Sequence, residues 1–444
     1  MIKRLSSLLL ALILSLSLFA PAEAAEDGVY AVAFSQAGLR LGMVRAMDGS
    51  YPGNIYLSLT DLAAALSGTA KQFRFERVVS SSDGEYFNVF LQQSAAMASG
   101  AEGSPAAAAA VTLSPYRNRL FVDGQERRYY THNPKNGDLY MSVTDVQLML
   151  DITLTSTADG FEVSDTPFAP DPVALEQSGY FEMMNGVLLA DAESGQTLYY
   201  YNSGETLPVA SLSKLLSYLV LREAMDSGEI SMQDTVTISA AAEAVSRSGD
   251  GFVPLKEGDR VPLAELLQAM LIASSNECAL ALAEHLCGSE EAFVQRMKSR
   301  AAELGLNSVE IFNCSGLPVY SSGPIPVKLQ NRMSAVDLYR LCCLLLKQYP
   351  DITGITSVRL AHFPNMSDYR TANSNPLIYN MSGVTGLKTG STNRAGYCLV
   401  ATMPLEAQGT RHEIILVLLG AENADVRGQA AEILLRFARN FYSG

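Results

Sequence analysis

Residues 208–221 read PVASLSKLLSYLVL, and this stretch decides the fold of the C-terminal part of the chain. Residues 215–221 are apolar around most of the circumference of a helix, so we expect a buried central helix. Ser211 precedes Lys214 by three positions, and residues three apart share a helix face, so the Lys214 amine can reach the Ser211 hydroxyl. Burying an amine is costly unless it has a role. The stretch predicts Ser211 as a nucleophile at a helix N-terminus and Lys214 as its base.

A purely structural interpretation of the same stretch stays open at this point. Ser211 would then only cap the helix, and Lys214 would extend along the surface into solvent. Against this, the chain offers little else for a serine hydrolase, because it has only four histidines and no G-x-S-x-G elbow. A lysine held neutral can replace the missing histidine as the general base.

The composition excludes several classes of protein. The chain has 444 residues, 48% of them hydrophobic, and a formal net charge of -14, with 32 Lys and Arg against 46 Asp and Glu. This apolar fraction is enough for real cores, so the chain is not disordered as a whole. The acidic excess argues against a nucleic acid partner, which would need clustered lysine and arginine. Only nine residues are lysine, and we expect an acidic outer surface around a small positive cleft.

Two further motifs follow along the chain. Residues 274–276, Ser-Ser-Asn, lie between two apolar helical runs, where a hydroxyl and an amide two positions apart can point into one cleft. Residues 388–391, Lys-Thr-Gly-Ser, end a predicted strand, and a cation beside a hydroxyl suits a peptide that ends in a carboxylate. Taken singly, the first could be an ordinary helix N-cap and the second an ordinary end of a strand.

Together the three motifs resemble the S-x-x-K, S-D-N and K-T-G signature of class A β-lactamases and penicillin-binding proteins, with Ser-Ser-Asn in the middle. The motifs are 63 and 114 residues apart. The stretches 276–279 (NECA), 312–317 (FNCSGL) and 386–392 (GLKTGST) are similar to D-alanyl-D-alanine carboxypeptidases of the low-molecular-mass penicillin-binding type. The resemblance covers about residues 180–441. It implies a peptidoglycan stem peptide ending in D-Ala-D-Ala as substrate, acylation by β-lactam antibiotics, and no cofactor.

The resemblance also implies roles for four catalytic residues. Ser211 would form the acyl-enzyme, and Lys214 would accept its proton. Ser274 would relay protons to the leaving D-alanine. Asn276 would form a hydrogen bond with the substrate amide or with the Lys214 amine.

Four residues of the third motif are implied in substrate binding. Lys388 would attract the terminal carboxylate, helped by the Thr389 hydroxyl, and Gly390 would let another backbone approach. The backbone N–H groups of Ser211 and Ser391 would form the oxyanion hole. The neighbouring charge of Lys388 would also disfavour protonation of the base, and the strand edge could pair with the stem peptide.

The expected fold of this region is an α/β (α+β) sandwich of the β-lactamase and penicillin-binding transpeptidase type. Its five-stranded, mainly antiparallel sheet would join strands from both ends of the domain, with a helical block at 211–347 inserted between them. The expected strands are 186–192, 196–201, 383–389, 396–403 and 413–420, and a helix at 426–441 closes the domain.

The preceding region contains an internal repeat. Residues 55–62 (IYLSLTDL) recur as residues 139–146 (LYMSVTDV), and in both copies a short strand meets Ser-x-x-Asp, which resembles a capping box. An apolar helix and a further strand (72–78 and 153–163) follow, so we expect two strand–helix–strand units. The unit is similar to the repeat of copper-amine-oxidase N-terminal-like stalk domains, without implying copper. We expect such a domain to contact the cell wall or another protein.

Four segments are therefore expected along the chain. They are a signal peptide at 1–25, a separate small α+β repeat domain at 26–167, a proline-rich linker at 168–178 and the catalytic domain at 179–444. The signal peptide has Lys3 and Arg4 before an apolar run and Ala22-Glu23-Ala24 at its end, so we expect cleavage near Ala24 or Ala25 and an extracytoplasmic protein. An uncleaved membrane anchor is the alternative. Between the repeats, residues 94–110 are expected to form a loose loop.

The six cysteines all lie in the C-terminal half. An even number in an exported chain permits disulfides, but two adjacent cysteines lie in the apolar run 341–346, so we favour buried free thiols. A zinc site is not expected, because no C-x-x-C or H-x-x-x-H pair occurs. These residues are therefore expected to act as small hydrophobic side chains rather than as ligands.

Two rival functions remain open. A β-lactamase needs a group that activates the deacylating water, usually Glu with Asn four positions later, whereas Glu310 and Asn313 are three apart. A non-catalytic wall-binding or penicillin-sensing module would have lost catalytic groups, and none is missing. Two departures from the family pattern are Glu277 and Cys278, where Asp and Ala are more usual. We also expect no trailing β-domain or amphipathic anchor after the closing helix.

Overall fold

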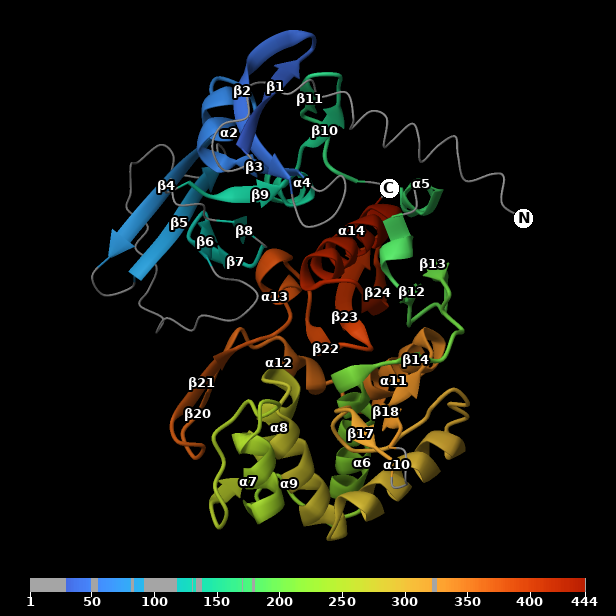
Figure 1. The fold of residues 1–444 in the computed structure, drawn as a ribbon. Coiled ribbons are helices and arrows are strands. Elements are labelled where there is room, and N and C mark those ends of the chain that lie inside the picture. The colour runs from blue at the N-terminus through green and yellow to red at the C-terminus, as the bar shows by residue number, and fades with distance from the viewer. Residues whose placement is uncertain are drawn as a thin grey trace. The chain divides into compact units, whose positions relative to one another are not determined.

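The computed structural model describes residues 29–48, 55–80, 84–91, 118–129, 131–132, 138–169, 171–177, 180–321 and 326–443. The chain divides into two compact units, residues 1–178 and 179–444, called here the N-terminal and C-terminal units (Figure 1). The boundary between the two units follows residue 178, which is the last residue of the linker expected at 168–178. The signal peptide expected at 1–25 and the loop expected at 94–110 lie outside the described residues.

The described part of the N-terminal unit contains two sheets. One has the strand order β10-β11-β1-β2-β3-β9-β8, and the other has the order β4-β5-β6-β7. The strands are β1 (Val29–Gln36), β2 (Leu39–Asp48), β3 (Ile55–Ser58), β4 (Phe73–Ser80), β5 (Gly84–Leu91), β6 (Arg119–Val122), β7 (Gln125–Arg127), β8 (Thr131–His132), β9 (Tyr140–Ser142), β10 (Thr153–Ser156) and β11 (Gly160–Ser164). The helices are α2 (Leu59–Ala65), α4 (Val143–Leu150) and α5 (Pro172–Gln177).

The two copies of the repeat meet in the first sheet. Ser58 and Ser142 begin helices α2 and α4, each accepting a hydrogen bond of 3.1 Å from the N–H of the aspartate three residues later. Strands β3 and β9 pair antiparallel with Leu57 opposite Met141. These two residues hold equivalent positions in the repeat, so the copies pair symmetrically.

One expected element of the repeat is wrong. Residues 153–163 do not form a single strand, but two antiparallel strands, β10 and β11, in which Ser156 pairs with Phe161. The turn between them contains Asp159-Gly160, a dipeptide that favours tight hairpins. Gly160 is also required by packing, because a Cβ there would lie 1.8 Å from the Ala33 carbonyl oxygen of the neighbouring strand β1.

The C-terminal unit has a five-stranded antiparallel sheet in the order β13-β12-β24-β23-β22. These strands are β12 (Gly186–Asp191), β13 (Thr197–Tyr201), β22 (Gly386–Thr392), β23 (Gly396–Ala407) and β24 (Thr410–Ala421). β12 pairs with β24, with Val187 opposite Leu418, so both ends of the unit meet in one sheet as expected. Residues 414–421 of β24 are all buried, and helices α11 and α14 both pack against this strand.

The helical block lies between β13 and β22 in the sequence (Figure 1). Its helices are η2 (Ala210–Ser213), α6 (Lys214–Asp226), α7 (Ala240–Arg247), α8 (Leu263–Ile272), α9 (Asn276–Cys287), α10 (Glu290–Glu303), α11 (Ala335–Gln348), α12 (Ile352–Thr356) and α13 (Leu377–Asn380). The unit also contains η1 (Tyr180–Met183) and α14 (Ala424–Ser443). The predicted central helix is α6, which belongs to the main hydrophobic core.

Short strand pairs, which the sequence analysis did not predict, connect these helices. They are β14 (Leu207–Pro208) with β19 (Arg332–Met333), β15 (Thr235–Thr237) with β16 (Arg260–Pro262), β17 (Val319–Tyr320) with β18 (Lys328–Leu329), and β20 (Leu360–Phe363) with β21 (Tyr369–Ala372). Strands this short carry too little alternation to be detected in a sequence. One of the pairs, β17–β18, contributes Tyr320 and Lys328 to the cleft described below.

The six cysteines are free thiols in the structure. Four are buried, Cys278, Cys314, Cys342 and Cys398, and the other two are partly buried. Within the described residues, no group of His, Cys, Asp or Glu side chains is arranged to hold a metal ion. The same part of the chain contains no helix that is long and apolar enough to span a membrane.

Candidate active site

The first candidate pair lies at the start of the buried helix α6. Ser211 is in the turn η2, and Lys214 is the first residue of α6, with its side chain completely buried. Lys214 Nζ lies 3.0 Å from Ser211 Oγ, 2.7 Å from Asn276 Oδ1 and 2.7 Å from the Ser315 carbonyl oxygen. The structure therefore joins the first two sequence motifs and adds a backbone carbonyl that the sequence did not reveal.

The three partners of Lys214 are not equivalent. The oxygens of Asn276 and Ser315 can only accept hydrogen bonds, whereas the Ser211 hydroxyl can also donate one. A neutral amine has two N–H groups and one lone pair. The two acceptors take the two N–H groups, so the lone pair of a neutral Lys214 faces the Ser211 hydroxyl. This is the arrangement that a general base requires.

Burial makes the neutral form of Lys214 accessible. Loss of hydration lowers the pKa of its amine to about 7, from an ordinary value of 10.5. The nearby Cys314, Glu277 and Cys278 oppose this shift. The sequence analysis attributed the shift to repulsion by Lys388, but its main cause is the removal of the amine from water.

The second motif forms the turn between α8 and α9. Asn276 links two parts of the site, because its Oδ1 accepts from Lys214 and its Nδ2 donates to the Asp250 carbonyl at 2.8 Å. Ser275 caps α9 by accepting from the Cys278 N–H at 3.0 Å. Ser274 adopts a left-handed backbone conformation (φ 62°) and is partly buried. Among the described residues, its hydroxyl has no hydrogen bond to Ser211 or Lys214.

The third motif lies on β22, the edge strand of the five-stranded sheet. A Cβ on Gly390 would lie 2.9 Å from the Ser211 backbone nitrogen, so glycine lets this strand approach the turn that carries Ser211. The Thr389 and Ser374 hydroxyls are 2.6 Å apart. Ser391, which follows Gly390 on β22, is exposed and lines the same cleft as Ser211.

Lys388 is a second buried lysine in this strand. Its side chain is 1% exposed, and its Nζ donates to the Thr389 carbonyl at 2.8 Å. Burial lowers the pKa of Lys388 well below its usual value, and the nearby cations of Lys214 and Arg427 lower it further. Lys388 is thus a buried amine that, among the described residues, forms no ion pair with an acidic side chain.

Arg427 is a residue that the sequence analysis missed. It lies on α14, is 5% exposed, and places its guanidinium 5.8 Å from the centre of the Tyr397 ring. Within the described residues its Nε has no hydrogen-bond acceptor. The sequence pattern of residues 426–441 indicated only an amphipathic helix, in which an arginine belongs to the solvent face.

The loop 312–316 supplies the third partner of Lys214. Asn313 Oδ1 accepts from the Ser315 N–H at 3.1 Å and from the Gly316 N–H at 2.6 Å, which fixes the Ser315 carbonyl toward the lysine. Gly316 has φ 90° and packs against the Ala210 carbonyl, where a Cβ could not fit. The stretch FNCSGL contained this loop, but a backbone carbonyl leaves no signal in a sequence.

Glu277 has a definite structural role. Its side chain is completely buried, and its Oε1 accepts from the N–H groups of Phe252 (2.9 Å) and Val253. The loop at 249–252 lines the cleft, so Glu277 holds one wall of the site. This position also brings a carboxylate near Lys214.

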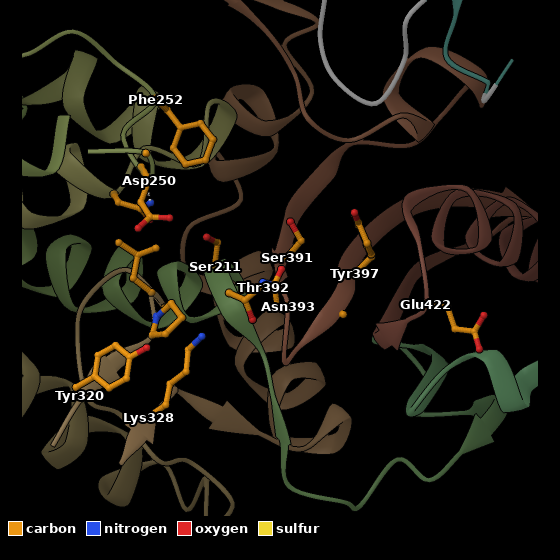
Figure 2. Close-up of a pocket in the computed structure, with 16 residues that line it drawn as sticks. Ser211, Asp250, Phe252, Tyr320, Lys328, Ser391, Thr392, Asn393, Tyr397 and Glu422 are labelled. Carbon is orange, nitrogen blue, oxygen red and sulfur yellow. Dashed lines mark hydrogen bonds between the residues drawn. The ribbon is translucent and has the colours of Figure 1, made fainter. Parts of the chain in front are cut away.

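A cleft of about 780 Å³ opens above Ser211 (Figure 2). Asn276, Ser391, Thr392, Tyr320 and Phe252 line it. The charged side chains that line it are one lysine, Lys328, and two acids, Asp250 and Glu422. The sequence analysis expected a positive cleft, but its surface carries charges of both signs, and the amines of Lys214 and Lys388 are buried beneath it.

Comparison with known proteins identifies relatives of this region. Residues 183–423 match the family model of D-alanyl-D-alanine carboxypeptidases (Peptidase_S11). D-alanyl-D-alanine carboxypeptidase DacF of Bacillus subtilis is 34% identical over 281 residues, covering 62% of this chain and 68% of the relative. DacD of Escherichia coli is 28% identical over 290 residues, covering 64% and 69%. The crystal structure of penicillin binding protein 6B from Escherichia coli is similar with a TM-score of 0.51 and 28% identity, covering 61% of this chain and 80% of that one.

Proposed function

The chain belongs to the D-alanyl-D-alanine carboxypeptidase family of serine hydrolases, and we propose that Ser211 is the nucleophile with which it removes the terminal D-alanine from peptidoglycan stem peptides. The observation that carries this assignment is the environment of Lys214. Two acceptors hold the N–H groups of its neutral amine, and the remaining lone pair faces the Ser211 hydroxyl at 3.0 Å.

In the acylation step, Lys214 accepts the Ser211 proton while Ser211 Oγ attacks the carbonyl carbon of the penultimate D-alanine. The backbone N–H groups of Ser211 and Ser391 stabilise the resulting oxyanion. Close contact between Gly390 and the Ser211 backbone supports this assignment, because it brings the two donors to one side of the nucleophile.

Collapse of the tetrahedral intermediate breaks the C–N bond to the terminal D-alanine. The leaving amine takes up the proton held by Lys214, and we assign the Ser274 hydroxyl to this relay. Water then attacks the ester, its proton passes to Lys214, and the proton returns to Ser211 Oγ when the C–O bond breaks. Asn276 keeps Lys214 oriented in both steps through the contact of 2.7 Å.

Lys388 and Thr389 form the proposed site for the terminal carboxylate. Burial and the neighbouring Lys214 and Arg427 lower the pKa of Lys388, and the negative charge of a bound carboxylate would raise it again, so that the amine gains a proton as the substrate binds. The Thr389 hydroxyl, 2.6 Å from Ser374 Oγ, supplies a directional hydrogen bond. The edge strand β22 offers backbone groups for antiparallel pairing with the peptide.

A labelled penicillin tests this function against its rivals. Durable acylation of Ser211, seen as a stable mass increase of the intact protein, is expected together with release of D-alanine from a stem pentapeptide. Rapid loss of the label with turnover of the penicillin would instead identify a β-lactamase. A chain that neither labels nor releases D-alanine would be the non-catalytic binding module.

Members of this family act on cell-wall peptidoglycan, so the site works outside the cytoplasm. We propose that residues 1–25 direct the export and are removed near Ala24 or Ala25. Mass spectrometry of the N-terminus of the mature protein tests this. An intact residue 1 would favour the uncleaved anchor.

We propose that the N-terminal unit contacts the cell wall or another protein. Leu39 and Val79 are 73% and 72% exposed on its strands, which gives this unit apolar side chains available for contact. Co-sedimentation of the full chain with purified cell-wall sacculi, after Ser211 has been acylated by penicillin, tests wall binding without a contribution from the active site.

A further inference from the structure

The loop 312–316, which carries the carbonyl partner of the catalytic lysine, contains no helix or strand and is held by side chains from outside it. The Cys314 N–H donates to Glu290 Oε1 at 3.0 Å, and the Cys314 carbonyl accepts from Ser217 Oγ at 2.7 Å. A backbone without regular structure takes its shape from such contacts, because its polar groups need partners once they are buried. The position of the Ser315 carbonyl is therefore set by the residues that surround the loop.

Asn331 makes four contacts with this loop, and its side chain is completely buried. Its Oδ1 accepts from the Phe312 N–H at 2.7 Å and from the Asn313 N–H at 3.3 Å. Its Nδ2 donates to the Asn313 carbonyl at 2.9 Å and lies 3.4 Å from Asn313 Oδ1. Asn313 Oδ1 is the atom that accepts from the Ser315 N–H, so one side chain separates Asn331 from the residue whose carbonyl faces the lysine.

The backbone of Asn331 supports the segment that carries the nucleophile. Its carbonyl accepts from the Val209 N–H at 3.1 Å, and Val209 precedes the turn η2, which contains Ser211. The next residue pairs with the same segment, because Arg332 of β19 lies opposite Pro208 of β14. Asn331 therefore contacts the segments that position the hydroxyl and the amine, although it is not among the residues that line the cleft.

We propose that Asn331 is a positioning residue for the acylation step. It holds the loop so that the Ser315 carbonyl accepts one N–H group of Lys214 and the lone pair of the amine faces the nucleophile. Without the Asn331 amide, two N–H groups and one carbonyl of the loop lose a partner, and the loop shifts to find others. The amine then keeps Asn276 Oδ1 as an acceptor but loses the second one that fixes its orientation. This inference rests on the proposed function, because it takes Lys214 as the general base.

Asn331→Ala should lower the plateau rate of Ser211 acylation by penicillin about 30-fold, since a small misplacement of a catalytic group can cost up to about 100-fold. The penicillin concentration that gives half of the maximal rate should stay within about twofold, because Asn331 does not line the cleft. Stopped-flow acylation at several penicillin concentrations separates these two quantities.

The pH profile of acylation gives a second readout. A carbonyl that accepts from an amine stabilises the charged form of that amine, so loss of the Ser315 carbonyl should lower the pKa of Lys214. The midpoint of the profile should move to lower pH by about half a unit or more. The variant leaves unchanged the other ionisable groups that interact with Lys214, which are Glu277, Cys278, Cys314 and Lys388.

A double-mutant cycle tests whether Asn331 acts through the loop. Asn313→Ala removes the side chain that orients Ser315 directly, and it should cause the same loss of rate and the same shift of the midpoint. Adding Asn331→Ala to this variant should lower the plateau by less than about twofold, because both residues act on the same carbonyl. Fully additive losses would show that Asn331 acts by another route and would overturn the proposal.

Gln330→Ala is the matched control, because this buried amide of the preceding residue donates to Thr392 Oγ1 at 2.9 Å and not to the loop. It should leave the midpoint of the pH profile in place. Circular dichroism shows that each variant is folded, and Asn331→Ser replaces Asn331→Ala if the alanine variant does not fold, since the shorter hydroxyl cannot contact both N–H groups.

Two results would overturn the positioning role of Asn331. One is a plateau that stays at the level of the unchanged protein. The other is a lower plateau with an unchanged midpoint, since a residue that only stabilises the fold changes the amount of active protein and not the pKa of the base. Failure of the intact protein to become acylated or to release D-alanine would instead overturn the proposed function.

Discussion

Helix α6 and strand β22 each bury one lysine beside Ser211, and the two lysines have opposite surroundings. Lys214 contacts three oxygens: two of them can only accept its N–H groups, and the third belongs to the hydroxyl that needs a base. Lys388 donates to one backbone carbonyl and has cations as neighbours. Burial lowers the pKa of both amines, but only the first is arranged around a proton donor. The difference shows that a buried lysine becomes a base or an anion receptor according to its hydrogen-bond partners rather than its burial.

Removing Lys214 should have the largest effect. Lys214→Ala is expected to slow acylation of Ser211 by about 10³-fold, because no other base in the described part of the chain forms a hydrogen bond with the hydroxyl. Lys214→Arg should be equally slow, since arginine stays protonated at all working pH values. The rate of labelling by a fluorescent penicillin measures this. Lys298→Gln is the control, and near-normal acylation of Lys214→Ala would show that Lys214 is not the general base.

Replacing Lys388 should have a smaller effect that depends on the substrate. Lys388→Gln is expected to lower kcat/KM about 100-fold for a pentapeptide with a free terminal carboxylate, because a buried charge pair with the substrate is lost. For the same peptide ending in a carboxamide, the loss should be less than about threefold. Equal losses with both peptides would mean that Lys388 acts on the catalytic residues instead of binding the carboxylate.

The pH dependence tests the comparison without mutation. Lys214 must be neutral to accept a proton, and its pKa is about 7, so acylation should rise with pH and level off above this value. At one pH unit below the midpoint, about a tenth of the amine is neutral, and the rate should fall to about a tenth of the plateau. Stopped-flow acylation between pH 5 and pH 9 measures the profile. A rate that falls as pH rises through 7 would contradict a neutral lysine base.

The sequence could predict the residues of the site that belong to a motif, but not the backbone atoms and distant side chains that surround the two lysines. An apolar stretch around Lys214 and three motifs in a fixed order were enough to place Ser211, Asn276 and the edge strand in one site. The Ser315 carbonyl could not be found, because a backbone acceptor leaves no residue type to recognise. Arg427 could not be found either, because helical periodicity cannot show that its side chain lies near Lys388. Asp250 lies in a loop and Lys328 in strand β18, and only the folded chain brings them to the same cleft.

The smallest effect should come from Glu277, which links the wall of the cleft to the base. Its carboxylate raises the pKa of Lys214, opposing burial, so removing the charge should lower that pKa. In Glu277→Gln, the amide oxygen can still accept from the Phe252 N–H, and the midpoint of the acylation profile should move to lower pH. The rate at pH 6 should then be up to about twofold higher than in the unchanged protein. Glu257→Gln, on the exposed surface, should leave the profile in place. A midpoint that stays constant or moves upward in Glu277→Gln would show that this carboxylate only supports the loop and does not tune the base.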